Sequence, residues 1–314
     1  MRSVLPFAAR LTITETQAWL DALRNALPDC DVLLLEDATE AQRAGVEVAI
    51  AANPDPATLK TLPNLKWVQS LWAGVEHLLA ETQDADFAIV RMTDPHLAKT
   101  MAEAVLAWTL YLHRDMPRYR AQQDVRLWQQ HPTLLPSQRT IGVLGLGNMG
   151  KAACQTLVQH GFKVCGWGRS PTSIVGVETH DGEEGLDAVL RQSTILVCLL
   201  PLTPQTRGLL TEETLTLLPN GASFINFARG PIVDTSALLR HLDCGHLAHA
   251  VLDVFDEEPL PQESPLWSHP NITILPHVSA LTNKQTASKL VAENINQFLI
   301  NRTIPLSVDK TLGY

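Results

Sequence analysis

The sequence predicts an α/β fold built from two parallel-sheet domains, and three observations favour it. The chain has 314 residues, which is longer than most single hydrophobic cores, so we expect two domains. Its composition, 45% hydrophobic and 18% charged, is typical of a globular protein. Short apolar runs alternate with amphipathic helical patterns along most of the chain, and this alternation indicates parallel sheets.

The first series of strands and helices occupies about the first hundred residues. A helical pattern runs from Glu15 to Leu27, and a longer one from about Lys99 to Gln123 is interrupted by Pro117. We therefore place a domain boundary near residue 100. The apolar runs that we interpret as strands are Val32–Leu35, Val46–Ala51, Leu65–Leu71 and Phe87–Met92.

A second series follows, and its order is typical of a doubly wound, dinucleotide-binding Rossmann fold. Helical patterns separate the earlier strands of this series, and residues 283–300 are predicted to form one more helix after it. The expected strands are Thr140–Leu144, Lys163–Trp167, Ile195–Leu199, Ala222–Phe227, His249–Val254 and Ile272–Leu275.

Three glycines form a G-x-G-x-x-G pattern between the first strand of this series and a helical pattern. Gly145 suits the tight turn, Gly147 lets the backbone approach a pyrophosphate, and Gly150 lets the helix pack closely on the strand. The amides at the helix start, where Asn148 and Met149 lie, would then face the anion. The alternative is an ordinary glycine-rich turn between a strand and a helix.

The end of the second strand favours NADP over NAD. A site for NAD usually has an acidic residue about 20 residues after the glycines, where it binds the ribose hydroxyls. Here Gly168 occupies that place, and Arg169 and Ser170 follow it. Without the carboxylate, a guanidinium can bind the 2′-phosphate of NADP. Alternatively, Arg169 is only a solvated residue of the turn.

Three later strands each end next to a polar residue that suits one reaction. Arg229, Glu258 and His277 follow successive strands, and the carboxyl ends of parallel strands meet at one edge of the sheet. The arginine can bind a 2-keto acid and polarise its carbonyl. The histidine can donate a proton, and a neighbouring carboxylate would raise its pKa. Taken singly, each residue could instead have an ordinary structural role.

Asp253 is an acidic residue inside an apolar strand, so it must find partners or lose its charge. We leave two interpretations open. The carboxylate either makes a structural hydrogen bond or contacts the carboxamide of a nicotinamide ring.

Composition argues against several other classes of protein. The net charge is −9 and the basic residues are scattered, which disfavours nucleic acid as a partner. The five cysteines show no C-x-x-C spacing, so a reducing compartment is expected. The first residues lack a signal-peptide pattern and no long apolar run is present, so we expect a cytoplasmic protein without a membrane partner. We assign no metal ligands.

The motifs together resemble the D-2-hydroxyacid dehydrogenase family. They are the glycine pattern, LLPLTPQT, NFARGPIVD, LDVFDEEPLPQESPLW and PHVSALT, and they are most similar to those of NADP-dependent glyoxylate/hydroxypyruvate reductases. The resemblance implies that Arg229, Glu258 and His277 are catalytic. It also implies a flavodoxin-like substrate domain of residues 1–100 and 283–314 and a Rossmann domain of residues 101–282. Further cofactor contacts implied in this way are Leu200, Pro201, Thr206, Ala228 and Asp253.

The family also has a substrate loop in its first domain, matched here by SLWAGVEHLL. The resemblance implies that the amides of Ala73 and Gly74 bind the substrate carboxylate at a helix start. Trp72 departs from the small residue that is common at its place in the family. It either packs in the core or narrows the pocket for small substrates. Glu258 argues against the formate-specific branch, which has an amide there.

The sequence therefore predicts an enzyme that reduces small 2-keto acids, such as glyoxylate and hydroxypyruvate, to D-2-hydroxy acids with NADPH. The resemblance implies a homodimer. Two alternatives stay open: a nucleotide-sensing protein like the family's transcriptional corepressors, and a dehydrogenase for a bulkier 2-keto acid.

Overall fold

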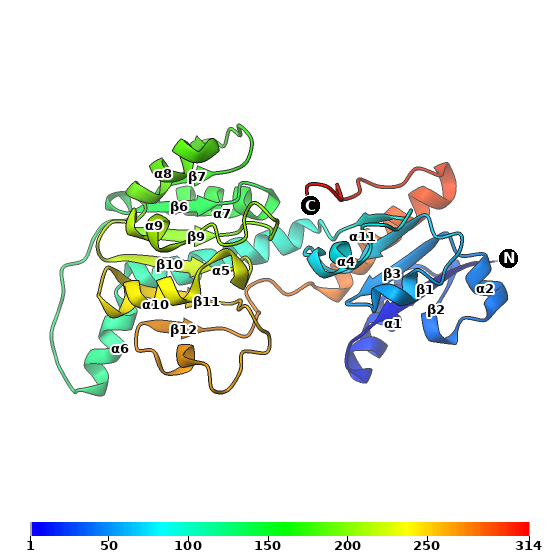
Figure 1. Ribbon diagram of the computed structural model, residues 1–314, viewed down its shortest axis with the longest axis horizontal. Helices are drawn as coiled ribbons and strands as arrows, with labels where there is room; N and C mark the ends of the chain where they lie inside the picture. The colour runs from blue at the N-terminus through cyan, green and yellow to red at the C-terminus, as the bar shows by residue number, and fades with distance from the viewer. Residues whose placement is uncertain (1, 314) are drawn as a thin grey trace. The chain divides into compact units, whose positions relative to one another are not determined.

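The computed structural model describes residues 2–313, and the chain divides into two compact units. The first unit comprises the described residues of Met1–His96 and Thr282–Tyr314, and the second comprises Leu97–Leu281. Each unit has its own sheet of parallel strands (Figure 1). The fold is therefore the predicted one, with two parallel-sheet α/β domains. The division falls after His96, where the sequence suggested a boundary near residue 100.

The first unit has a five-stranded sheet in the order β2-β1-β3-β4-β5. Its centre is fully buried, because all five residues of β3 (Val48–Ala52) are apolar and lie between covering layers. The other strands are β1 (Ser3–Ala9), β2 (Cys30–Leu34), β4 (Trp67–Ser70) and β5 (Ala88–Val90). The helices are α1 (Ile13–Ala26), α2 (Glu40–Ala44), α3 (Pro56–Leu59), α4 (Glu76–Glu81) and α11 (Lys284–Asn301).

Strand β1 was not predicted from the sequence, although it lies between β2 and β3. Pro6 argues against a central strand, because proline has no N–H to donate to a ladder. In the structure, β1 pairs with β2 along Ser3–Phe7, but its pairing with β3 begins only at Phe7. The proline thus precedes the part of the strand that is paired on both sides.

The second unit has a seven-stranded sheet in the order β12-β11-β10-β9-β6-β7-β8. The order reverses at β6, which pairs with β9 on one side and β7 on the other, and such a point is where nucleotides bind in open α/β sheets. The strands are β6 (Thr140–Leu144), β7 (Lys163–Trp167), β8 (Val177–His180), β9 (Ile195–Cys198), β10 (Ala222–Asn226), β11 (Leu247–Leu252) and β12 (Ile272–Ile274).

Helices connect these strands and cover both faces of the sheet. Val143 and Leu144 are adjacent in β6 but belong to different hydrophobic clusters, so both faces are buried. The helices are α5 (Pro95–His113), α6 (Met116–Asp124), α7 (Asn148–Gln159), α8 (Gly182–Gln192), α9 (Glu212–Thr216) and α10 (Thr235–Asp243). Short 3-10 turns are formed by Leu35–Asp37, Pro136–Gln138, Gly230–Ile232 and Pro265–Ser268.

The long helical pattern after residue 99 is two helices in the structure. The break falls at Asp115, whose φ of 53° is left-handed, and Pro117 lies in the first turn of α6. Proline is well tolerated there, because the first amides of a helix have no partner within it. The helical structure is therefore interrupted just before Pro117, the residue from which the sequence predicted the interruption.

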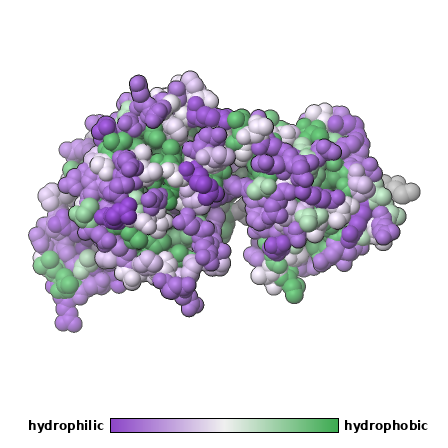
Figure 2. Space-filling model, in the orientation of Figure 1, coloured by the Kyte–Doolittle hydropathy of each residue, from purple (hydrophilic) through white to green (hydrophobic). Residues whose placement is uncertain are grey.

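The surface is mainly hydrophilic in the view of Figure 2, where apolar residues appear in small groups. Within the residues that the structure describes, no helix is long and apolar enough to cross a membrane.

The cysteines lie within the described residues and are all free thiols. Three of them are buried between the second sheet and its helices, and burial raises the pKa of Cys154 and of Cys198 to about 12 and that of Cys165 to about 11. Cys30 is also buried, whereas Cys244 is exposed.

Candidate active site

The carboxyl edge of the second sheet brings together the side chains of Glu258 and His277. Nδ1 of His277 lies 2.7 Å from Oε2 of Glu258, and both side chains are partly exposed. Because an ionised carboxylate only accepts hydrogen bonds, Nδ1 carries the proton between them. Oε1 of Glu258 accepts a second hydrogen bond, of 3.0 Å, from the Phe255 amide. The Phe255 amide therefore holds the Glu258 carboxylate in place while the carboxylate orients the His277 imidazole.

The pKa values of the pair move in opposite directions. The hydrogen bond that His277 donates to Glu258 raises the pKa of His277, and this outweighs burial, which lowers it. Burial alone would raise the pKa of Glu258, but the hydrogen bonds from His277 and from the Phe255 amide leave it below its ordinary value. The pair therefore favours an imidazolium beside a carboxylate, which is a proton donor with its counter-ion.

Arg229 completes the group. It follows β10, and its Nη1 donates a 2.6 Å hydrogen bond to the carbonyl oxygen of Ala228. Its positive charge lowers the pKa of both Glu258 and His277. The guanidinium is thus close enough to act on both partners electrostatically. The three residues that the sequence placed on successive strand ends meet at one edge.

The backbone at His277 is unusual. Its φ of 56° is left-handed, a conformation that residues other than glycine rarely adopt. Beside it, the buried carboxylate of Asp253 accepts hydrogen bonds from the amides of Val278 (2.7 Å) and Ser279 (3.0 Å). The structural interpretation of Asp253 thus has its partners in the structure. Contact with a nicotinamide carboxamide stays a prediction.

The three glycines after β6 have the geometry that a dinucleotide needs. Gly145 has a φ of 100°, and a Cβ on it would lie 2.8 Å from the Leu199 carbonyl oxygen. A Cβ on Gly150 would lie 1.8 Å from the Gly145 carbonyl oxygen, so helix α7 packs directly on the turn. A Cβ on Gly147 would meet nothing within 4 Å. The turn is therefore tight and open on the side where a pyrophosphate would approach, next to the exposed Asn148 and half-buried Met149.

The other predicted cofactor contacts surround this turn or the adjacent strand ends. Arg169 and Ser170 are exposed just after β7, where a 2′-phosphate would be bound. After β9, the Thr206 hydroxyl donates a 2.6 Å hydrogen bond to the Pro201 carbonyl oxygen, so this threonine ties its own loop. Leu200, in the same loop as Pro201, is buried. Ala228, just after β10, is buried as well. Their roles in binding stay predictions.

The predicted substrate loop lies in the first unit. Ala73 and Gly74 precede α4, which begins at Glu76, so their amides lie in the loop before the helix and not in its first turn. Trp72 packs edge-on against Trp19 with ring centroids 5.8 Å apart. Its indole nitrogen is buried and has no hydrogen-bond partner among the described residues. Trp72 thus packs against Trp19 within the first unit, and its contact with substrate stays a prediction.

Sequence reasoning missed Gly230, which fixes the spacing of the two loops that carry Arg229 and Glu258. A Cβ on Gly230 would lie 2.0 Å from the carbonyl carbon of Phe255 and 2.4 Å from the nitrogen of Asp256. Gly230 directly follows Arg229, while Phe255 begins the segment that carries Glu258. The backbones of the two loops therefore touch because position 230 has no side chain. Its φ is not left-handed, so local turn chemistry gave no signal.

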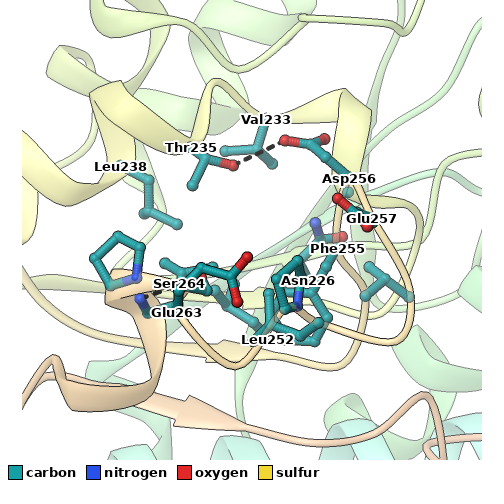
Figure 3. A pocket seen from close by; sticks show the side chains of 16 residues that line it. Asn226, Val233, Thr235, Leu238, Leu252, Phe255, Asp256, Glu257, Glu263 and Ser264 are labelled. Atoms are coloured by element: carbon teal, nitrogen blue, oxygen red, sulfur yellow. Dashed lines mark hydrogen bonds between the residues drawn. The ribbon is translucent and has the colours of Figure 1, made fainter.

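A cavity of about 330 Å³ lies beside the Glu258 loop. Figure 3 shows Thr235 and Asp256 on its rim, joined by a hydrogen bond of 3.2 Å. Residues from the ends of β10 and β11 line it, but none of the three glycines does. The cavity is therefore separate from the glycine turn after β6.

The fold and this group of residues define a dinucleotide-binding oxidoreductase. Comparison with known proteins gives the family: the model of the D-isomer specific 2-hydroxyacid dehydrogenase NAD binding domain matches residues 106–279. The chain belongs to the D-isomer specific 2-hydroxyacid dehydrogenases.

Solved structures that match this chain over almost its whole length support the same family. A D-isomer specific 2-hydroxyacid dehydrogenase from Xanthobacter autotrophicus, in complex with NADPH and MES, is 38% identical, with a TM-score of 0.93, over 98% of this chain and 99% of that one. An NADPH-dependent glyoxylate/hydroxypyruvate reductase from Sinorhizobium meliloti, in complex with NADP and sulfate, is 34% identical over the whole of both chains, with a TM-score of 0.91. A probable 2-hydroxyacid dehydrogenase from Rhizobium etli, in complex with NADP, HEPES and tartaric acid, is 32% identical over the whole of both chains, with a TM-score of 0.90.

Proposed function

We propose that the protein reduces small 2-keto acids, glyoxylate and hydroxypyruvate among them, to D-2-hydroxy acids with NADPH. The observation that carries this proposal is the 2.7 Å contact between His277 and Glu258, with the Arg229 charge acting on both. That group is a proton donor, its orienting base and an anion-binding cation at the carboxyl edge of a dinucleotide-binding sheet.

Arg229 binds and polarises the substrate. A guanidinium offers two parallel N–H donors, which match a carboxylate or the pair of oxygens of a 2-keto acid. Positive charge beside the keto oxygen stabilises the negative charge that develops there during reduction.

His277 supplies the proton. Glu258 fixes Nδ1, so Nε2 is the nitrogen that exchanges a proton with the substrate oxygen. The raised pKa of His277 favours the protonated imidazole, which is the form that the reducing direction requires. NADPH, when bound, supplies the hydride.

Arg169 and Ser170 give the preference for NADPH. Both are exposed after β7, and no acidic residue stands at the end of that strand to repel a 2′-phosphate. The complexes of the three relatives with NADPH or NADP support this assignment. The name of the Sinorhizobium meliloti relative supports glyoxylate and hydroxypyruvate as substrates.

The test is a panel of 2-keto acids of increasing size, assayed with NADPH and with NADH by the absorbance of the reduced nicotinamide. We expect the highest kcat/KM with the two small acids and NADPH, and D-configured products on chiral chromatography. A His277→Ala variant should bind NADPH normally but lose roughly 10²- to 10⁴-fold in kcat. A preference for bulky acids would contradict the substrate assignment, and no turnover with any acid would favour a nucleotide sensor.

We also propose a cytoplasmic homodimer. The five free thiols suit a reducing compartment. Residues 125–135 expose apolar side chains, with Trp128 96%, Val125 72% and Leu135 65% accessible. A second copy of the chain covering this segment would bury that area.

A further inference from the structure

We propose that Asp253 positions His277: its carboxylate bridges the two backbone amides that follow the histidine and so holds His277 in the conformation that directs its ring at Glu258. This inference rests on the proposed function, because it concerns the proton donor of that reaction. Asp253 is here a positioning residue, acting through the backbone.

The conformation of His277 needs an external support. A left-handed φ of 56° is uncommon for any residue other than glycine, and such backbone conformations persist where their surroundings hold them. The chain before His277 is held by the sheet, since the Leu275 amide donates to the Leu252 carbonyl oxygen at 2.9 Å. The chain after it leaves the sheet, so its support must come from elsewhere.

Asp253 supplies that support. Oδ1 accepts from the Val278 amide at 2.7 Å and Oδ2 from the Ser279 amide at 3.0 Å, so each carboxylate oxygen holds one of two successive N–H groups. The side chain is 2% exposed, and its own amide donates to the Asn226 carbonyl oxygen at 3.1 Å. A charged acceptor fixed at the end of a buried strand thus holds the chain on the far side of His277.

The same short segment holds the partner of the histidine. Two residues after Asp253, the Phe255 amide donates to Oε1 of Glu258, whose other oxygen meets the imidazole. Residues 253–258 therefore set the position of both members of the pair. An asparagine at position 253 keeps the shape but has only one acceptor oxygen, so its NH2 group would face one of the two amide donors.

The charges facing His277 predict the effect on its titration. Glu258 and Asp253 raise its pKa, and Arg229 lowers it. Removing the charge of Asp253 therefore lowers the pKa of His277. The loss of protonated histidine, and of reduction with it, should begin at lower pH in Asp253→Asn.

The experiment compares Asp253→Asn with Asp29→Asn, a matched control that removes a charge from an exposed residue of the first unit, outside residues 253–258. We expect Asp253→Asn to lose on the order of 10²-fold in kcat, because small displacements of a reacting group have effects of this size. Its NADPH dissociation constant, from fluorescence titration, should be unchanged. Hydrogen exchange in the peptide 276–281 should accelerate, and the imidazole pKa from NMR should fall. The control should match the wild type in all four measurements.

Two results would overturn the inference. The first is weakened NADPH binding with unchanged exchange in 276–281, which would mean that Asp253 acts on the cofactor. The second is rapid hydrogen exchange of the Val278 and Ser279 amides in the wild type. Because this measurement needs no variant, it can be made even if Asp253→Asn does not fold. Hydrogen exchange and imidazole titration require no turnover, so they test the role of Asp253 even if no 2-keto acid is reduced. Absence of turnover with every acid would refute the proposed function and not this inference.

Discussion

Gly230→Ala should damage catalysis without touching any catalytic side chain. The new methyl group would lie 2.0 Å from the Phe255 carbonyl carbon, whereas ordinary contacts begin at 3.4 Å. The atoms it meets belong to the backbone, so no side chain can rotate away. Relieving the contact requires the Arg229 loop and the segment that carries Glu258 to separate by about 1.4 Å.

That opening separates Arg229 from the pair formed by Glu258 and His277. Misplacement of a reacting group by about 1 Å can cost roughly 10²-fold in rate. We therefore expect kcat for hydroxypyruvate reduction to fall by on the order of 10²-fold. Overpacking of this kind also lowers the free energy of unfolding by about 1–3 kcal/mol, which leaves the variant folded at room temperature.

The assay is steady-state reduction with NADPH, together with urea unfolding. Gly45→Ala is the matched control, because the nearest atoms to its Cβ would be 3.6 and 3.9 Å away and its φ is −93°. It should keep the wild-type rate and stability. If Gly230→Ala unfolds as the wild type does and retains full kcat, the two loops are not held by this contact and the reasoning is wrong.

Three further predictions concern charge and assembly. Glu258→Gln replaces the carboxylate that raises the pKa of His277 by a neutral amide, so the loss of reduction with rising pH should begin at lower pH; an unchanged pH profile of kcat would contradict the pairing. Arg169→Ala should raise the KM for NADPH by roughly 10- to 100-fold, the size of a lost charged hydrogen bond, and leave that for NADH nearly unchanged; equal effects on both would remove the 2′-phosphate assignment. Trp128→Ser should lower the mass measured by analytical ultracentrifugation from dimer toward monomer, and a wild type that sediments as a monomer would refute the dimer.

Much of the site was predictable because its requirements are local. The glycine turn has three separate steric requirements, and they are met within six residues of sequence by Gly145, Gly147 and Gly150. Glu258 and His277 follow adjacent parallel strands, so topology alone brings them to one edge.

The remaining features depend on contacts between distant parts of the chain. The left-handed backbone of His277 is tied to Asp253, which precedes it by more than twenty residues. Gly230 is required by the Phe255 peptide and by nothing near it in sequence. Strand β8 (Val177–His180) escaped prediction because it is a short edge strand with polar residues, which lacks the apolar run by which buried strands are recognised.

The one exposed thiol among the five cysteines, that of Cys244, is a natural labelling site for spectroscopy. Cys244 caps the C-terminal end of α10 and precedes β11, whereas Arg229, Glu258 and His277 follow the ends of their strands. A maleimide dye at pH 7 would react there in preference to the buried, protonated thiols such as Cys154 and Cys198. The label would then lie at the opposite edge of the sheet, where it can report on the tumbling of the protein while leaving turnover intact.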